Sequence, residues 1–110
     1  MHGINKHATE KQAQHLLSQY RMLINIAGSQ GDVTGKRANE LATTIDRALS
    51  AITIPIYQDI LVVRYQLGQS HNEAAKTVGL ASRTFDRYQQ RALLEFATLY
   101  SGSSLIVWSD

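Results

Sequence analysis

Residues 71–90 read HNEAAKTVGLASRTFDRYQQ, and this stretch decides the fold. A helix-turn-helix needs two short helices that meet at a steep angle across a tight turn. Ala75 is small enough to let the second helix cross the first closely, and Gly79 tolerates the positive φ of the turn. The side chains spaced to hold both helices against a core are Ala74, Val78, Leu80, Phe85 and Tyr88. The stretch therefore predicts a helix-turn-helix.

The residues upstream predict where the first of these helices begins and what precedes it. Ser70, followed three residues later by Glu73, is a capping-box pattern that marks a helix start. Pro55 suits the first position of an earlier helix that would run to about residue 66. Gly68 would end that helix with a positive φ. Its inward face is expected to carry Ile56, Ile60, Val63 and Leu67.

Apolar residues recur at helical spacing on both sides of this region. Two helices are expected before it, with inward faces made of Ala13, Leu16, Leu17, Tyr20, Leu23, Ile24 and Ala27, and of Ala38, Leu41, Ala42, Ile45, Ala48, Leu49 and Ile52. Residues 28–32 would join them as a loop. The last helix would bury Phe85, Tyr88, Ala92, Phe96 and Leu99. After a break at residues 101–104, residues 105–108 would form a short strand or a docking arm.

The expected fold is all-α, with about five helices, an N-terminal helical hairpin and a C-terminal helix-turn-helix. Residues 1–52 would hold the hairpin, residues 53–100 the helix-turn-helix DNA-binding region, and residues 101–110 a tail. The apolar stripes of the hairpin either complete a single core or pair with a second copy of the chain. We favour a homodimer through this half, because helix-turn-helix proteins often read two half-sites as dimers.

The composition of the chain excludes several kinds of functional site. A chain of 110 residues holds one domain, and the lack of cysteine excludes disulfides, thiolate metal sites and thiol nucleophiles. No stretch approaches the roughly 20 apolar residues of a membrane helix, and the N-terminus has no apolar signal-peptide core. We therefore expect a cytoplasmic protein without membrane contact. The net charge is only +2, so the case for nucleic acid depends on where the charges lie.

The outward face of the last helix suits DNA. Residues 76–91 contain five charged side chains: Lys76, Arg83, Asp86, Arg87 and Arg91. They sum to +3, so the rest of the chain sums to −1. The start of a recognition helix reaches base edges in the major groove, where Arg can fork onto guanine. We expect base contacts from Ser82, Arg83 and Arg87, and backbone contacts from Ser70, His71, Lys76, Thr84, Gln90 and Arg91. The alternative is that these side chains only form the solvated face of ordinary helices.

A family resemblance supports the DNA interpretation. Residues 55–93 resemble the fourth conserved region of bacterial sigma factors at Pro55, Arg64-Tyr65, Gly68, Ser70, Glu73, Ala75, Gly79-Leu80, Ser82, Thr84 and Arg91-Ala92-Leu93. More closely, residues 54–100 resemble small phage regulators of the ArpU (autolysin-regulatory) type, with the RinA-type activators as near neighbours. The resemblance covers somewhat less than half the chain. It implies control of late phage genes in a bacterial host, with base reading at the start of the second helix and contact with RNA polymerase.

Other functions are weaker alternatives. The motif would also suit a phage DNA-packaging protein like a small terminase, or a module that contacts RNA polymerase without DNA. We expect no enzyme, no cofactor and no metal. His2, His7 and His15 have irregular spacing for metal binding, and no carboxylate is expected to orient the Ser70–His71 pair for catalysis.

Overall fold

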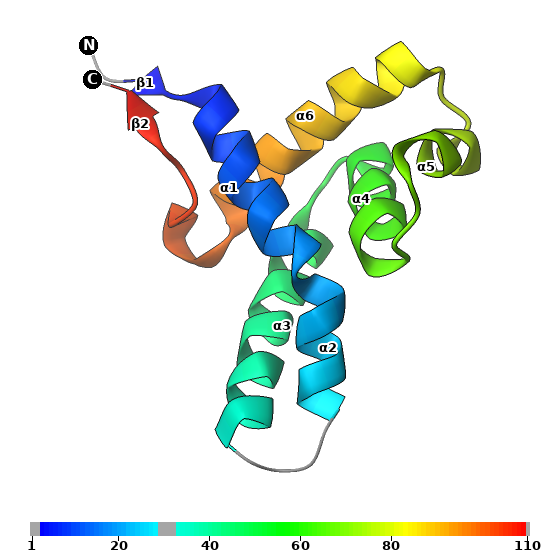
Figure 1. Cartoon of the computed structure of the whole chain (residues 1–110). Coiled ribbons are helices and arrows are strands. Elements are labelled where there is room, and N and C mark those ends of the chain that lie inside the picture. Colours follow the sequence, from blue (N-terminus) through cyan, green and yellow to red (C-terminus); the bar gives the residue numbers. More distant parts are fainter. Residues whose placement is uncertain (1–2, 29–32, 110) are drawn as a thin grey trace.

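The computed structural model describes residues 3–28 and 33–109. Helices build most of this part: α1 (Lys6–Ser18), α2 (Tyr20–Gly28), α3 (Val33–Ala51), α4 (Pro55–Leu61), α5 (His71–Val78) and α6 (Ser82–Leu99). A π-helical turn, η1 (Val62–Gln66), extends α4, and a 3-10 turn, η2 (Ser101–Ser103), follows α6. The strands β1 (Gly3–Ile4) and β2 (Trp108–Ser109) form a small antiparallel pair (Figure 1). The all-α prediction is confirmed.

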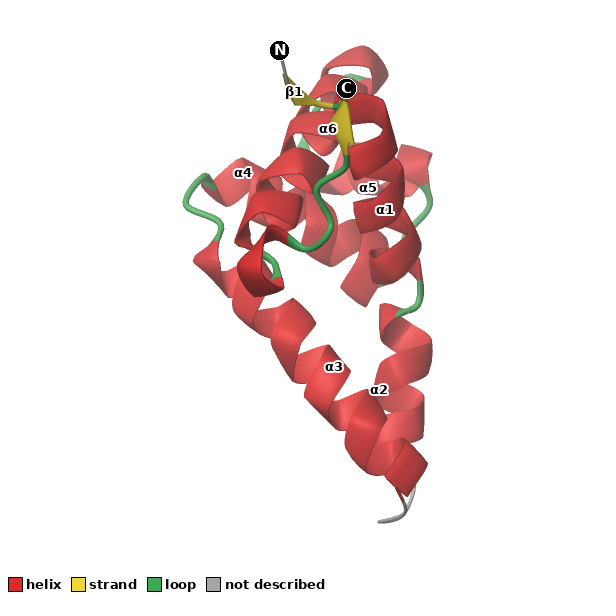
Figure 2. Cartoon of the chain, turned by 90° about the vertical axis from the view of Figure 1, so that its left-hand side faces the viewer, coloured by secondary structure: helices red, strands yellow, loops and turns green. Residues whose placement is uncertain are grey.

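The segment expected as one N-terminal helix is divided into α1 and α2. Gln19 lies between them, and its N–H bonds the carbonyl of Leu16 at 3.1 Å, three residues back, as in a tightened helical turn. α1 packs across α6, whereas α2 and α3 form a hairpin that projects from the rest of the molecule (Figures 1 and 2). The prediction of a single helix was wrong here. Residues 29–32 of the expected loop lie outside the described residues.

The core has two parts. The larger cluster is made of Ala13, Leu17, Tyr20, Ala42, Ile45, Ala48, Leu49, Ile52, Leu61, Tyr65, Ala92, Leu93, Phe96, Ala97 and Tyr100. The smaller cluster, which we call the motif core, is made of Ile60, Val63, Ala74, Ala75 and Phe85. Because the larger cluster draws on residues 1–52 and on residues 53–100, the N-terminal helices and the end of α6 share one core.

Three side chains expected to face inward are exposed: Ile24 of α2, which is 45% exposed, and two leucines. Leu67 is 59% exposed because η1 is a wide turn, in which the N–H of Leu67 bonds the carbonyl of Val62, five residues back, at 3.0 Å. Such a turn contains one residue more than a regular α-helical turn, so the positions after it rotate away from the inward face. Leu99 is 40% exposed, since it lies at an open hollow between α4 and α6.

The C-terminal segment is fastened to α1. Ile4 pairs with Trp108 across the two strands, and the N–H of Asn5 bonds the carbonyl of Val107 at 2.8 Å. The buried hydroxyl of Thr9 accepts a 2.9 Å hydrogen bond from the N–H of Val107. Both alternatives for residues 105–108 are therefore partly realised: a strand begins at Trp108, and the residues before it dock on the core.

Candidate nucleic-acid interface

Local interactions set the bounds of α5. The Ser70 hydroxyl accepts the Glu73 N–H at 3.2 Å, and the Glu73 carboxylate accepts the Ser70 N–H at 3.1 Å, which confirms the capping box. The hydrogen bond that the Ser70 N–H donates to the carboxylate, and then the Ser70 side chain beside it, hold the pKa of the Glu73 carboxyl below its usual value. Gly79 ends the helix with φ of 76°, as the turn of the motif requires. The predicted helix start and turn are thus both present.

The motif core fixes α6 against α5. Phe85 is fully buried and Ala75 is 6% exposed, and the N–H of Leu80 bonds the carbonyl of Ala75 at 2.9 Å across the turn. Val78, Leu80 and Tyr88 are half-buried against the same cluster. The five residues assigned to the structure of the motif, namely Ala75, Gly79, Leu80, Phe85 and Tyr88, therefore lie where the sequence predicted. A buried aromatic side chain in such a contact holds the two helices at one angle.

Arg64 adds a second support for α6. Its Nε donates to Gln89 Oε1 at 3.1 Å, and its Nη1 donates to the carbonyl of Gln69 at 2.9 Å. Gln69 Oε1 in turn accepts from the Thr77 hydroxyl on α5 at 2.7 Å. These bonds connect η1 with both helices of the motif. Arg64 matched the family pattern, but sequence alone did not reveal this role, because its two partners lie on α6 and in the loop that follows η1.

The start of α6 exposes the three side chains expected to read bases. Ser82, Arg83 and Arg87 are all exposed, and among the described residues neither arginine forms an ion pair. Ala81 occupies the N-cap without a side-chain hydrogen bond to the first turn. Backbone amides at an uncapped helix start suit an anion such as a phosphate oxygen. The first two turns of α6 thus present two exposed arginines together with backbone amides that have no side-chain cap.

His71 and Asp86 bind each other across the motif. The Nε2 atom of His71, at the start of α5, lies 2.5 Å from Asp86 Oδ1 on α6, and the His71 ring stands edge-on to Phe85. The expectation that no carboxylate orients His71 was wrong, because Asp86 lies fifteen residues away in sequence but adjacent in space. The Ser70 hydroxyl does not pair with His71, because it accepts the Glu73 N–H in the helix cap. The His71–Asp86 pair therefore joins α5 to α6, and the hydroxyl next to it in the sequence is engaged in the helix cap.

The remaining backbone-contact candidates are spread over both helices of the motif. Ser70, Lys76, Gln90 and Arg91 are exposed, whereas Thr84 is half-buried. The Arg91 guanidinium lies 5.9 Å from the centre of the Tyr88 ring, at a distance that allows a cation–π contact. This contact restrains Arg91 without neutralising its charge. Its cation remains available to a phosphate.

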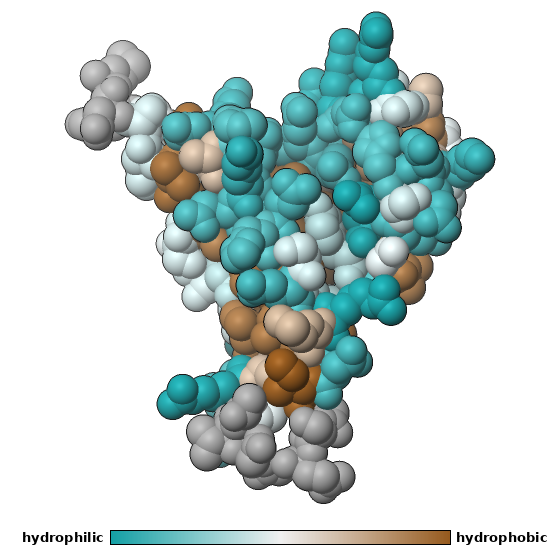
Figure 3. Space-filling view, viewed as in Figure 1, coloured by the Kyte–Doolittle hydropathy of each residue, from teal (hydrophilic) through white to brown (hydrophobic). Residues whose placement is uncertain are grey.

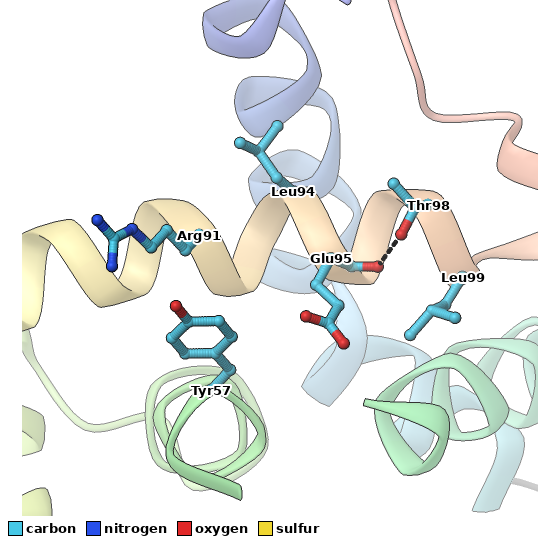
Figure 4. Close-up of a pocket in the computed structure, with 6 residues that line it drawn as sticks. All are labelled: Tyr57, Arg91, Leu94, Glu95, Thr98 and Leu99. Atoms are coloured by element: carbon cyan, nitrogen blue, oxygen red, sulfur yellow. Dashed lines mark hydrogen bonds between the residues drawn. The ribbon is translucent and has the colours of Figure 1, made fainter. Parts of the chain in front are cut away.

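A hollow of about 360 Å³ separates α4 from α6 on the other side of Arg91. Figure 4 shows Tyr57 rising from α4 toward α6, between Arg91 and Glu95, while Leu94 leaves the opposite side of α6. Glu95 Oε1 accepts the Thr53 N–H at 3.4 Å, so it serves the connection between α3 and α4. The hollow is lined by apolar groups of Tyr57, Leu94 and Leu99 and by the polar side chains of Arg91, Glu95 and Thr98.

The described part of the chain contains no cluster of three or more His, Asp or Glu side chains that could hold a metal ion. His7 lies in the first turn of α1, and His2 is outside the described residues. Within residues 3–28 and 33–109, no helix is both long enough and apolar enough to cross a membrane.

Comparison with other proteins identifies no relative. No protein-family model matches the chain, and neither the curated proteins nor the solved structures show a significant similarity to it. The features that bear on function are therefore the geometry of α5 and α6 and the resemblance of residues 54–100 to the ArpU-type regulators.

Proposed function

We propose that this protein is a sequence-specific, double-stranded DNA-binding transcriptional regulator that reads the major groove with α6. The observation that carries the proposal is the pair of exposed, unpaired arginines, Arg83 and Arg87, at the start of a helix held by the motif core. Unpaired arginines lose no ion-pair partner when they bind guanine or phosphate. A helix fixed on two sides keeps them in register with the base pairs.

In this mechanism, backbone contacts position the protein and base contacts select the site. Lys76 on α5 and the amides of the first turn of α6 bind phosphates. Arg83 and Arg87 are separated by about 6 Å along the helix axis, close to the length of two base-pair steps, so they address base pairs about two steps apart. Ser82 supports them from the first turn. We assign His71 to holding Asp86, because its Nε2 atom is already engaged, rather than to a phosphate.

The regulatory context comes from the resemblance to sigma region four and to the ArpU-type phage regulators. On that basis the protein controls late phage genes through contact with RNA polymerase. The cytoplasm of a bacterial host is the matching location. Control of late phage genes would be a consequence of DNA binding, and the assignment of DNA binding to α6 does not require it.

A homodimer is part of the proposal, but the apolar surface available for it is smaller than the full apolar stripes of the hairpin. Most of those side chains are buried within the chain itself. On α2, Met22 is 54% exposed and Ile24 is 45% exposed. Figure 3 shows hydrophobic surface gathered over the α2–α3 hairpin. Contact between two hairpins would join two α6 helices in one molecule, as a protein that reads two half-sites requires. Sedimentation equilibrium with Met22→Lys as the comparison tests this arrangement.

DNA binding is best tested by fluorescence anisotropy on labelled duplexes. Sites are selected from a random duplex library, and binding to the best site and to a scrambled duplex is measured across a salt series. Arg83→Ala and Arg87→Ala should each cost roughly 1–3 kcal/mol on the selected site and relax one base preference. Arg47→Ala is the matched control, since Arg47 is an exposed arginine on the α3 helix of the hairpin.

The outcomes separate base reading from general charge attraction. Equal losses on selected and scrambled duplexes would remove the base-reading role of Arg83 and Arg87. A loss in Arg47→Ala as large as in Arg87→Ala would show that net charge, not position, controls binding. If the folded wild-type protein binds no duplex at any salt concentration, the proposal is wrong.

A further inference from the structure

A groove between α1 and the middle of α6 borders the proposed DNA-reading surface. It encloses about 340 Å³ and is lined by Lys6, Glu10, Arg87, Gln90, Arg91 and Leu94. Arg87, Gln90 and Arg91 are side chains that the proposed function places against DNA. A duplex seated on them must therefore run close beside α1.

The two helices diverge from a single crossing. Ala13 and Leu17 of α1 are buried with Ala92 and Phe96 of α6, and beyond this contact the N-terminal halves of both helices separate like the arms of a V (Figure 1). Figure 1 also shows α5 on the other side of α6 from α1. Lys6 lies seven residues before Ala13, about 10 Å along its arm. A helix in a major groove about 12 Å wide has a phosphate strand on each side.

The charges of α1 on this groove favour an anion at one position. Within the described ranges, Lys6 forms no ion pair and is exposed. Glu10 lies one turn further along α1, where burial raises its pKa while the nearby His7 and Lys6 lower it. In Figure 3, hydrophilic side chains cover the N-terminal halves of α1 and α6 on either side of this groove. A phosphate near the open end of the groove would meet Lys6 first, whereas Glu10 would repel it deeper in.

We infer that Lys6 of α1 contacts the phosphodiester backbone on one wall of the major groove, opposite the wall contacted by α5. The inference rests on the proposed function and adds a partner to the same site. It means that the N-terminal helix is part of the DNA-binding surface as well as part of the core. Glu10 then limits how closely the backbone can approach α6.

The test compares three variants on one labelled duplex of about 25 base pairs, roughly twice what the protein's longest extent of 42 Å would span. Lys6→Ala should reduce the slope of log affinity against log salt by about 0.9, the value for one lost phosphate contact. Lys11→Ala is the control, because Lys11 is an exposed lysine of the same helix that lines a separate hollow. It should leave the slope unchanged. Glu10→Gln should raise the affinity at low salt.

Each outcome has a distinct meaning. A slope reduced in Lys6→Ala and retained in Lys11→Ala supports the inference. If the wild type binds DNA and loses affinity in Arg87→Ala, while Lys6→Ala behaves as wild type, the inference is overturned and the proposed function stands. Equal effects of Lys6→Ala and Lys11→Ala would also overturn it, because position would not matter. Absence of DNA binding by the wild type would instead remove the proposed function. Circular dichroism confirms that each variant is folded.

Discussion

Replacing Tyr20 by Phe should weaken the joint between the α2–α3 hairpin and η1. Tyr20 is 4% exposed, and its hydroxyl donates to Asp46 Oδ1 at 2.5 Å. The same hydroxyl accepts from Gln66 Nε2 at 3.1 Å, and that nitrogen also lies 3.2 Å from Asp46 Oδ1. Three elements, α2, α3 and η1, meet at this hydroxyl. Phenylalanine keeps the ring in the core and removes only the shared oxygen.

The pKa of Tyr20 sets the magnitude. Burial, and then the hydrogen bond to Asp46, raise this pKa from 10.0 to about 12. Two pKa units are equivalent to about 2.7 kcal/mol between phenol and phenolate, which is an upper bound for the hydrogen bond because burial is the largest cause of the shift and Asp46 is exposed to water. A hydrogen bond to a charged group contributes about 1.5–3 kcal/mol. After the solvent discount, we expect the substitution to lower the free energy of unfolding by about 1–2 kcal/mol near pH 8.

The pH dependence gives the sharper check. A pKa raised in the folded state means that the protonated phenol favours folding. Its contribution is complete below pH 10, the unfolded value, and is lost as pH rises toward 12. The gap between wild type and Tyr20→Phe in urea denaturation should therefore be constant from pH 7 to 9 and shrink by pH 11. A gap below about 0.5 kcal/mol at pH 8, or one that stays constant up to pH 11, would refute this reasoning. Tyr57→Phe is the control.

Three further predictions concern the motif. At Gly79, where an added Cβ meets no atom within 4 Å, alanine should cost about 1 kcal/mol from the left-handed backbone alone, and asparagine should cost less. If urea denaturation gives the same loss of stability for alanine and asparagine at Gly79, the left-handed backbone is not the cause. Ser70→Ala should lower stability by about 1 kcal/mol through the lost cap, measured by thermal unfolding, and an unchanged midpoint would show that the cap contributes nothing. Asp86→Asn should raise DNA affinity about two- to fivefold at low salt, since a carboxylate between Arg83 and Arg87 is neutralised. Anisotropy that shows weaker binding would contradict a phosphate or base partner for this face of α6.

The helix-turn-helix could be predicted from sequence because its determinants are local. A capping residue, a small side chain, a glycine turn and a buried aromatic all lie within the twenty residues that follow Gln69. Each acts on its own turn of helix, so spacing alone specifies it. The exposure of Arg83 and Arg87 follows from the same helical period.

The rest required contacts between distant segments. The break at Gln19 arises where α1 must lie on α6 while α2 turns to α3, and no residue of that segment signals it. The turn η1 shifts Leu67 outward because Leu61 and Tyr65 pack into the larger cluster while Ile60 and Val63 pack into the motif core. The groove beside Lys6 exists only because α1 crosses α6. Periodicity describes one helix at a time and carries no information about such crossings.

The packing of α1 on α6 also has a consequence for how the chain folds as it is synthesised. Leu17 shares a core cluster with Phe96, which lies about eighty positions later in the chain. At ribosomal rates of about 5–20 residues per second, Phe96 is therefore synthesised roughly 4–16 s after Leu17. The α2–α3 hairpin can form locally during that interval, but the apolar face of α1 has nothing to cover it. That face therefore stays open to chaperone capture in the nascent chain, and the surface proposed to read DNA is completed only after α6 has been synthesised.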